Sequence, residues 1–124
     1  WDAILIKENH IHAAGGIAEV LTAARLVAGQ AGDRCRFIQI EVESLAELRV
    51  ALDAGATMIL LDNFTLAIMR EAVTINAGRA ILEASGNVTL ETIRGIAETG
   101  VDRISVGALT KDVKALDLSM RFID

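Results

Sequence analysis

Short runs of Ile, Val and Leu alternate along this chain with longer stretches in which apolar residues recur at helical spacing. This alternation constrains the fold more than any other feature, because it is typical of βα units that build a parallel sheet. We therefore predict five strands, at Ala3–Ile6, Arg36–Val42, Thr57–Leu61, Ala80–Glu83 and Arg103–Val106. Between them we predict helices near Gly15–Ala28, Leu45–Asp53, Leu66–Asn76 and Leu90–Glu98, and a last short helix from about Asp112.

Local signals define several ends of these helices. Ser44 and Glu47 form a capping-box pattern, in which the serine oxygen accepts an unpaired backbone N–H and the glutamate reaches back to the cap. Gly55 and Gly100 each follow a helical stretch and precede a strand, where a left-handed residue ends a helix without the steric cost of a Cβ. The two glycines are also 45 positions apart within a repeated pattern, so the chain resembles repeats of one βα building block.

The predicted fold is α/β: five consecutive βα units with a parallel sheet, forming part of a TIM-like barrel. A flavodoxin-like open sheet of five strands with helices on both faces has the same size and is the alternative. Nothing in the sequence marks a linker, so residues 1–124 are expected to form a single domain.

Composition excludes several classes of function. The formal charge is -5 and the basic residues form no stripe, so nucleic acid is not an expected partner. The only cysteine, Cys35, precludes an internal disulfide and favours a reducing, cytoplasmic setting. Apolar runs are shorter than the roughly 20 residues that a membrane helix needs, so no membrane association is expected.

Polar residues follow each of the five apolar runs. In βα proteins the ligand site lies at the carboxyl ends of the strands, so these residues are expected to meet at one edge of the sheet. Lys7 ends the first run, where its ammonium group could hold a carboxylate or phosphate. Glu41 and Asp62 end the second and third runs and could together hold sugar hydroxyls or Mg²⁺, which prefers oxygen ligands.

Each of these residues also has an ordinary structural explanation. Lys7 could be a solvated lysine at a strand end, and the segment from Asp62 to Thr65 could supply a helix N-cap. Gln39, Glu41 and Glu43 share one face of the second strand and its branched residues share the other. In a barrel this polar face would point inward, whereas in an edge strand it would be exposed to solvent. We expect Asn9 and His10 to support a loop and His12 to be a surface residue.

Two glycine-containing loops follow the last two strands. Ser85, Gly86 and Asn87 precede one helix, and Gly107, Ala108 and Lys111 lie beyond the fifth strand. Small residues let backbone N–H groups approach a phosphate, and Lys111 adds a positive charge. Many βα-barrels bind phosphate at this position, so the residues predict a site for a phosphorylated sugar without specifying the reaction.

The chain closely resembles quinolinate phosphoribosyltransferases (nicotinate-nucleotide pyrophosphorylases, carboxylating). The resemblance covers nearly the whole chain in collinear blocks, which are Leu5-Ile6-Lys7-Glu8-Asn9-His10, Ile40-Glu41-Val42-Glu43, Leu61-Asp62-Asn63-Phe64, Glu83-Ala84-Ser85-Gly86-Asn87 and Ser105-Val106-Gly107-Ala108-Leu109-Thr110-Lys111. It implies that quinolinate reacts with phosphoribosyl pyrophosphate, assisted by Mg²⁺, to give nicotinate mononucleotide, pyrophosphate and CO₂.

The resemblance also implies roles for individual residues. Lys7 would contact quinolinate, Glu41 and Asp62 would hold the ribose hydroxyls and the metal, and the remaining residues would hold phosphate: Ser85, Gly86, Asn87, Gly107, Ala108 and Lys111. Gln39 departs from the family, whose members often carry a carboxylate there.

The family also has an N-terminal domain and an earlier part of the barrel, whose arginines and histidine hold quinolinate. The chain starts at Trp1 without them, so we expect the C-terminal barrel part, inactive alone, and an oligomer of identical chains. The alternative is an engineered or truncated half-barrel scaffold without catalytic function.

Overall fold

The computed structural model describes residues 3–31, 37–86, 88–106 and 114–117. Strands and helices alternate along most of the chain. In order they are β1 (Ala3–Ile6), α1 (Glu8–Ala14), α2 (Ile17–Ala31), β2 (Phe37–Val42), α3 (Leu45–Asp53), β3 (Met58–Asp62), α4 (Leu66–Asn76), β4 (Ile81–Ser85), α5 (Ile93–Glu98), β5 (Arg103–Val106) and β6 (Lys114–Asp117).

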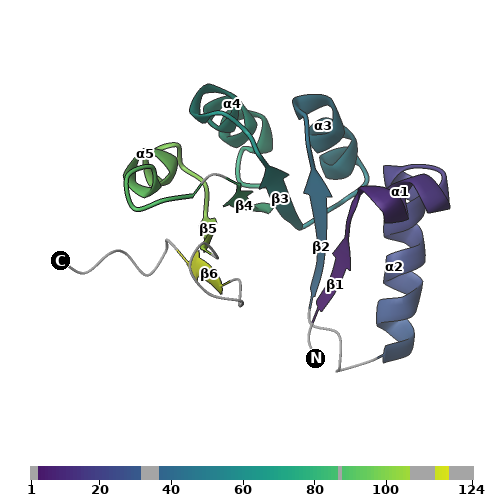
Figure 1. Cartoon of the computed structure of the whole chain (residues 1–124). Coiled ribbons are helices and arrows are strands. Elements are labelled where there is room, and N and C mark those ends of the chain that lie inside the picture. Colours follow the sequence, from purple (N-terminus) through teal and green to yellow (C-terminus); the bar gives the residue numbers. More distant parts are fainter. Residues whose placement is uncertain (1–2, 32–36, 87, 107–113, 118–124) are drawn as a thin grey trace.

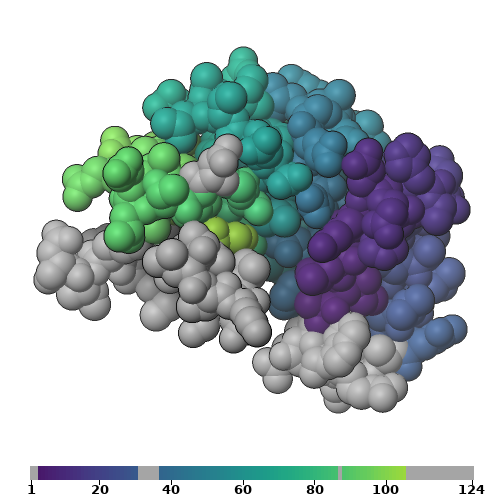
Figure 2. All heavy atoms as spheres, viewed as in Figure 1, coloured from purple at the N-terminus to yellow at the C-terminus, as the bar shows by residue number. Residues whose placement is uncertain are grey.

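All strands belong to one sheet in the order β1-β2-β3-β4-β5-β6. The first five are parallel, as predicted, and consecutive strands are neighbours. The helices lie along the convex side of this curved sheet (Figure 1), and the space-filling view has the outline of an arc (Figure 2). This is the arrangement of a partial βα-barrel. The flavodoxin-like alternative is wrong, because that fold reverses its strand order and covers both faces with helices.

The core lies between the sheet and the helices. The residues of the strands that face this core are buried, including Ile40, Ile59 and Ile104, all at 0% exposure. Side chains alternate along a strand, so the opposite, concave face carries the other set. On β2 the predicted division is confirmed: Ile40 and Val42 are buried, whereas Gln39 and Glu41 on the concave face are half-buried.

The C-terminal part of the prediction needs correction. The helix expected from about Asp112 is wrong over residues 114–117, which form β6, although Asp112 itself lies outside the described residues. β6 pairs antiparallel with β5, from Arg103 opposite Asp117 to Val106 opposite Lys114. The physical reason is that β4 covers only one edge of β5. The backbone N–H and C=O groups of the other edge need partners, and β6 supplies them.

The segment after β1 also differs from the prediction. Asn9 and His10 lie in α1 rather than in a loop, and the helix predicted from Gly15 begins at Ile17. Gly15 and Gly16 separate α1 from α2 with φ values of 94° and 152°, which glycine adopts without a Cβ clash. Helix α5 starts at Ile93 rather than Leu90, because the preceding residues form a turn in which Thr92 N–H donates to Thr89 O.

The predicted helix ends at the two glycines are confirmed. Gly55 and Gly100 have φ values of 85° and 97°, in the left-handed region. At the start of α3, Ser44 Oγ accepts the N–H of Glu47 at 3.1 Å. Glu47 reaches back one residue further than the capping box requires, because its Oε1 accepts the N–H of Glu43 at 2.7 Å. This bond holds the residue that follows β2.

No single helix in the described part of the chain is long and apolar enough to cross a membrane. Helices α1 and α2 pass such a test together by length and composition alone, with a bend of 95° between them.

Candidate functional site

The carboxyl ends of the parallel strands bring those predicted residues that the structure describes to one edge of the sheet. Glu41 is the register partner of Leu60, and Leu60 is the partner of Glu83, so these residues form one row across the concave face. Asp62 and Ser85 are partners in the next row toward the carboxyl edge. Lys7 directly follows β1 at the same edge. Strand register therefore gathers side chains that are far apart in the sequence.

Three carboxylates form the centre of this edge. Glu41, Glu43 and Asp62 each offer an oxygen, and these oxygens lie within 4.8 Å of one another. Glu41 and Asp62 are half-buried, whereas Glu43 is exposed. We call these three residues the acidic cluster. It joins the two carboxylates that the sequence predicted, Glu41 and Asp62, with one that it placed on the same face of β2.

Burial of Glu41 is the largest cause that raises the pKa of its carboxyl above the usual range. A hydrogen bond with Asp62 and the negative charge of Asp62 raise this pKa further, and the charge of Glu43 adds to the effect. The Lys7 ammonium acts in the opposite direction and lowers it. Glu41 therefore holds a proton more readily than a free glutamate, and a cation that replaced this proton would relieve the same repulsion.

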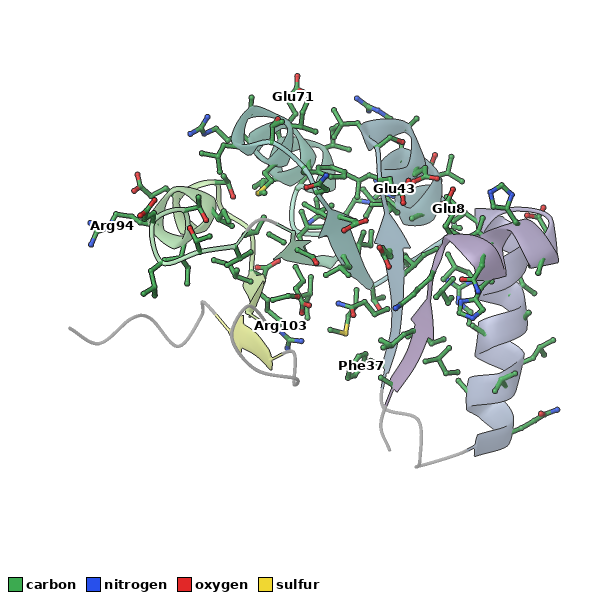
Figure 3. All side chains as sticks on the ribbon, in the orientation of Figure 1. Glu8, Phe37, Glu43, Glu71, Arg94 and Arg103 are labelled. Carbon is green, nitrogen blue, oxygen red and sulfur yellow. The ribbon has the colours of Figure 1, made fainter. Side chains whose placement is uncertain are left out.

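Glu8 is a carboxylate to which the sequence assigned no role. Its charge is the largest cause that raises the pKa of Glu43, ahead of burial and the charge of Glu47. Figure 3 shows Glu8 and Glu43 close together where α1 meets the carboxyl end of β2. Helix α1 brings this group near Glu43, and because Asn9 and His10 were expected to support a loop, the sequence could not predict the contact.

Lys7 is exposed and occupies the N-cap position of α1. Its backbone N–H donates to His10 Nδ1 at 3.0 Å, so His10 supports the start of the helix. Lys7 also lines a small pocket of about 40 Å³ together with Leu5, Ile6, Gln39, Glu41 and Leu60. His12 is a surface residue as expected, with 78% of its side chain exposed and Nε2 lying 3.6 Å from Glu8 Oε1.

Ser85 and Gly86 lie beside the loop that follows β3. The backbone carbonyl of Ser85 accepts the N–H of Asn63 at 2.9 Å. Gly86 has a φ of 90°, and a Cβ on it would lie 3.2 Å from both the N and the Cα of Asn63. Glycine is therefore needed here for close packing of two loops. The other predicted phosphate-loop residues, Asn87, Gly107, Ala108 and Lys111, lie outside the described residues.

One structural alternative is confirmed and another is wrong. The segment from Asp62 to Thr65 does supply the N-cap of α4, through Thr65, whose Oγ1 accepts the N–H of Ile68 at 3.2 Å. The carboxylate of Asp62 belongs to the acidic cluster. Strand β2 is not an edge strand, because it pairs with β1 on one side and β3 on the other. The exposure of an edge strand to water therefore does not explain the polar residues on the concave face of β2.

Glu83 is a further carboxylate on the concave face, and only 8% of it is exposed. Its Oε2 accepts the hydroxyl of Ser105 at 2.5 Å, which links β4 to β5. The sequence placed Glu83 among the polar strand ends but gave it no function. The pairing with Ser105 depends on strand register and has no signal in the linear sequence.

A curved sheet with five parallel strands, helices on its convex side and a charged carboxyl edge define the class: a βα-barrel domain, a class in which ligands bind at the carboxyl ends of the strands. Residues 1–121 match the family model described as quinolinate phosphoribosyl transferase, C-terminal domain. The chain belongs to this family.

Relatives of known name agree with this assignment. The probable nicotinate-nucleotide pyrophosphorylase [carboxylating] of Bacillus subtilis is 41% identical over 120 residues, which cover 97% of this chain and 40% of that protein. A mitochondrial quinolinate phosphoribosyltransferase [decarboxylating] 2a of Nicotiana tabacum is 39% identical over 137 residues, covering 98% of this chain and 38% of the relative.

Solved structures show the same similarity. The nicotinate-nucleotide pyrophosphorylase of Francisella tularensis superposes with a TM-score of 0.81 at 46% identity, covering 94% of this chain and 40% of that one. The chain thus spans about two fifths of the length of the relatives it matches.

Proposed function

We propose that this chain supplies the carboxyl-edge part of a phosphoribosyltransferase site that joins quinolinate to the ribose of phosphoribosyl pyrophosphate and releases pyrophosphate and CO₂. The observation that carries the proposal is the acidic cluster at the carboxyl ends of β2 and β3, with the Lys7 charge acting on Glu41. Carboxylates suit a reaction in which positive charge develops on the ribose ring, because they stabilise that charge where it forms.

In this proposal Lys7 and the acidic cluster bind different substrates. Lys7 is exposed beside the small concave pocket and would hold a carboxylate of quinolinate. Glu41 and Asp62 would accept hydrogen bonds from the ribose hydroxyls. Ser85 and Gly86, at the end of β4, would meet the phosphate together with Asn87, Gly107, Ala108 and Lys111. This arrangement would orient the ribose between its attacking and leaving groups, and positioning of this kind supplies much of the rate of a two-substrate reaction.

The donor set fits Mg²⁺. Three carboxylates with oxygens within 4.8 Å of one another offer the hard oxygen ligands that this ion prefers, and the substrate phosphates would complete its shell. Glu41 and Asp62 would hold the ion, with Glu43 beside them. When bound, Mg²⁺ would neutralise charge on the pyrophosphate leaving group. A bound cation would also offset the repulsion between these carboxylates that raises the pKa of Glu41.

The whole reaction needs more than the described edge. The concave face leaves Leu5 with 54% and Ile81 with 38% exposure. Apolar residues on an open sheet face favour association, so we propose that the chain works with further protein, including other copies of itself. Turnover by this chain alone is not expected.

Calorimetric titration with phosphoribosyl pyrophosphate tests the proposal. We expect binding that requires Mg²⁺ and that falls at least tenfold in Glu41→Gln and in Asp62→Asn. Glu71→Gln is the matched control, because Glu71 is an exposed carboxylate on α4, on the convex side (Figure 3). Binding that ignores Mg²⁺, or that weakens equally in the control, would contradict the proposal and favour a scaffold without this function.

A further inference from the structure

Glu83 is a buried carboxylate that the proposed reaction does not use. Its side chain is 8% exposed, although it faces the concave side of the sheet rather than the apolar core. Burial of a charged group is costly unless it is hydrogen-bonded, and Glu83 has such a bond to the Ser105 hydroxyl. This bond offsets part of the cost of burial and ties Glu83 to the neighbouring strand β5.

The bond lies where the backbone pairing between β4 and β5 is short. Strands β3 and β4 pair over five residues each. The described pairing of β4 with β5 covers two, Glu83 with Arg103 and Ala84 with Ile104. Ser105 follows the last of these pairs, so the Glu83 side chain extends the connection between the two strands toward the carboxyl edge by one residue.

Both partners lead directly into the predicted phosphate-binding segments. Glu83 precedes Ser85 by two positions on β4. Ser105 precedes Gly107 by two positions, and Gly107 itself lies outside the described residues. The hydrogen bond thus holds together the two strand ends from which the two loops begin.

We propose that Glu83 is a positioning residue for the phosphate group of the ligand, acting through Ser105 to fix the separation of the strand ends that precede the two loops. The proposal rests on the proposed function. Glu83 acts as a hydrogen-bond acceptor in this role, and its charge is not required. A glutamine, whose side-chain oxygen also accepts a hydroxyl, should therefore replace it.

The experiment measures the affinity for phosphoribosyl pyrophosphate with Mg²⁺ by calorimetry in four single variants, each checked for folding by its thermal melt. Glu83→Ala and Ser105→Ala remove the two ends of the bond. We expect each to weaken binding about fivefold, the order of the net contribution of one hydrogen bond, and the double variant to lose little more than either. Glu83→Gln should stay within about twofold of the unchanged protein.

Asp102→Ala is the matched structural control. Asp102 Oδ2 accepts the N–H of Leu82 at 2.8 Å, so it links the same two strands at their amino ends. Its loss should lower the melting temperature yet leave the affinity within about twofold. An equal loss of affinity in Asp102→Ala would overturn the proposal, because any loosening of the sheet would then suffice.

Two other results would also overturn it. Glu83→Gln as weak as Glu83→Ala would show that the charge contacts the ligand directly, and unchanged affinity in both alanine variants would remove the role altogether. If Glu83→Ala does not fold, Ser105→Ala and Glu83→Gln decide the matter. Absence of binding by the unchanged protein would instead contradict the proposed function, so the two failures are distinguishable.

Discussion

Replacement of Glu41 by glutamine should stabilise the chain when no divalent cation is present. Two carboxylates whose oxygens lie within 4.8 Å of one another repel each other by at least about 0.9 kcal/mol even in water, and burial increases this value. Glu41 faces two such neighbours, Asp62 and Glu43, while Lys7 offsets part of the repulsion. Glutamine keeps the shape of the side chain and can still donate to Asp62. We therefore expect a gain of about 1 kcal/mol in the free energy of unfolding at pH 7.

Magnesium should reverse this order. A ligand at ten times its dissociation constant stabilises the folded state by about 1.4 kcal/mol. The unchanged chain should gain this amount, whereas Glu41→Gln has lost a ligand and should gain much less. Urea unfolding with a chelator and then with MgCl₂ measures both effects. Glu71→Gln provides the control, since it removes one negative charge from an exposed position on α4 without touching the acidic cluster.

Two results would refute this reasoning. A Glu41→Gln variant that is less stable than the unchanged chain without Mg²⁺ would show that hydrogen bonds, not repulsion, dominate the acidic cluster. An equal gain from Mg²⁺ in both proteins would place the cation elsewhere.

Three further predictions concern pH, phosphate and turnover. Because the pKa of Glu41 is raised on folding, the folded chain binds this proton more tightly than the unfolded chain. The contribution of Glu41 to the free energy of unfolding should fall as pH rises from about 4.5 through its raised pKa, which urea unfolding at several pH values would show. Mg²⁺ binding should strengthen over the same pH range, which calorimetry would show. In an NMR titration, inorganic phosphate should shift the amides of Ser85 and Gly86; Lys111→Ala should weaken this binding and His12→Ala should not. The purified chain should form no nicotinate mononucleotide in an assay with both substrates, because it spans about two fifths of its relatives' length, and detectable product would contradict this expectation.

Apolar runs and helical periodicity predicted most of the strands and the longer helices. The bounds of α3 and α4 are those expected, and β1 and β5 also agree. Helix α1 has seven residues, too few for an amphipathic pattern to emerge, and its Asn9 and His10 are typical of loops as well. The short segment Lys114–Asp117 carries no decisive local signal. Its conformation is determined by pairing with the edge of β5 that β4 leaves uncovered, and this pairing cannot be read from the local sequence.

The site followed from a topological rule rather than from local chemistry. Lys7, Glu41, Asp62 and Ser85 each end an apolar run, and parallel strands bring such ends together. This rule could not predict which individual side chains contact each other. The approach of Glu8 to Glu43 depends on α1, and the bond from Ser105 to Glu83 depends on register between β4 and β5. Both require the distance between elements, which a linear pattern does not contain.

The opposite edge of the sheet should affect stability without affecting ligands, and Asn76 offers a test. This side chain is 4% exposed at the end of α4. Its Oδ1 accepts the N–H of Ala80 at 2.9 Å and its Nδ2 donates to the carbonyl of Ala80 at 2.8 Å. The side-chain amide thus pairs with both backbone groups of Ala80 and stabilises the turn that leads into β4. Asn76→Ala leaves two buried backbone groups unpaired and should cost about 2–3 kcal/mol in unfolding by urea. Asn76→Asp should lose more at pH 7 than at low pH, because only its protonated form can donate to Ala80 O. At a temperature where the variants remain folded, affinity for phosphoribosyl pyrophosphate with Mg²⁺ should be unchanged, since Asn76 lies at the amino end of β4 and the acidic cluster at the carboxyl edge. A loss of affinity in folded Asn76→Ala would show that the two edges are coupled through β4.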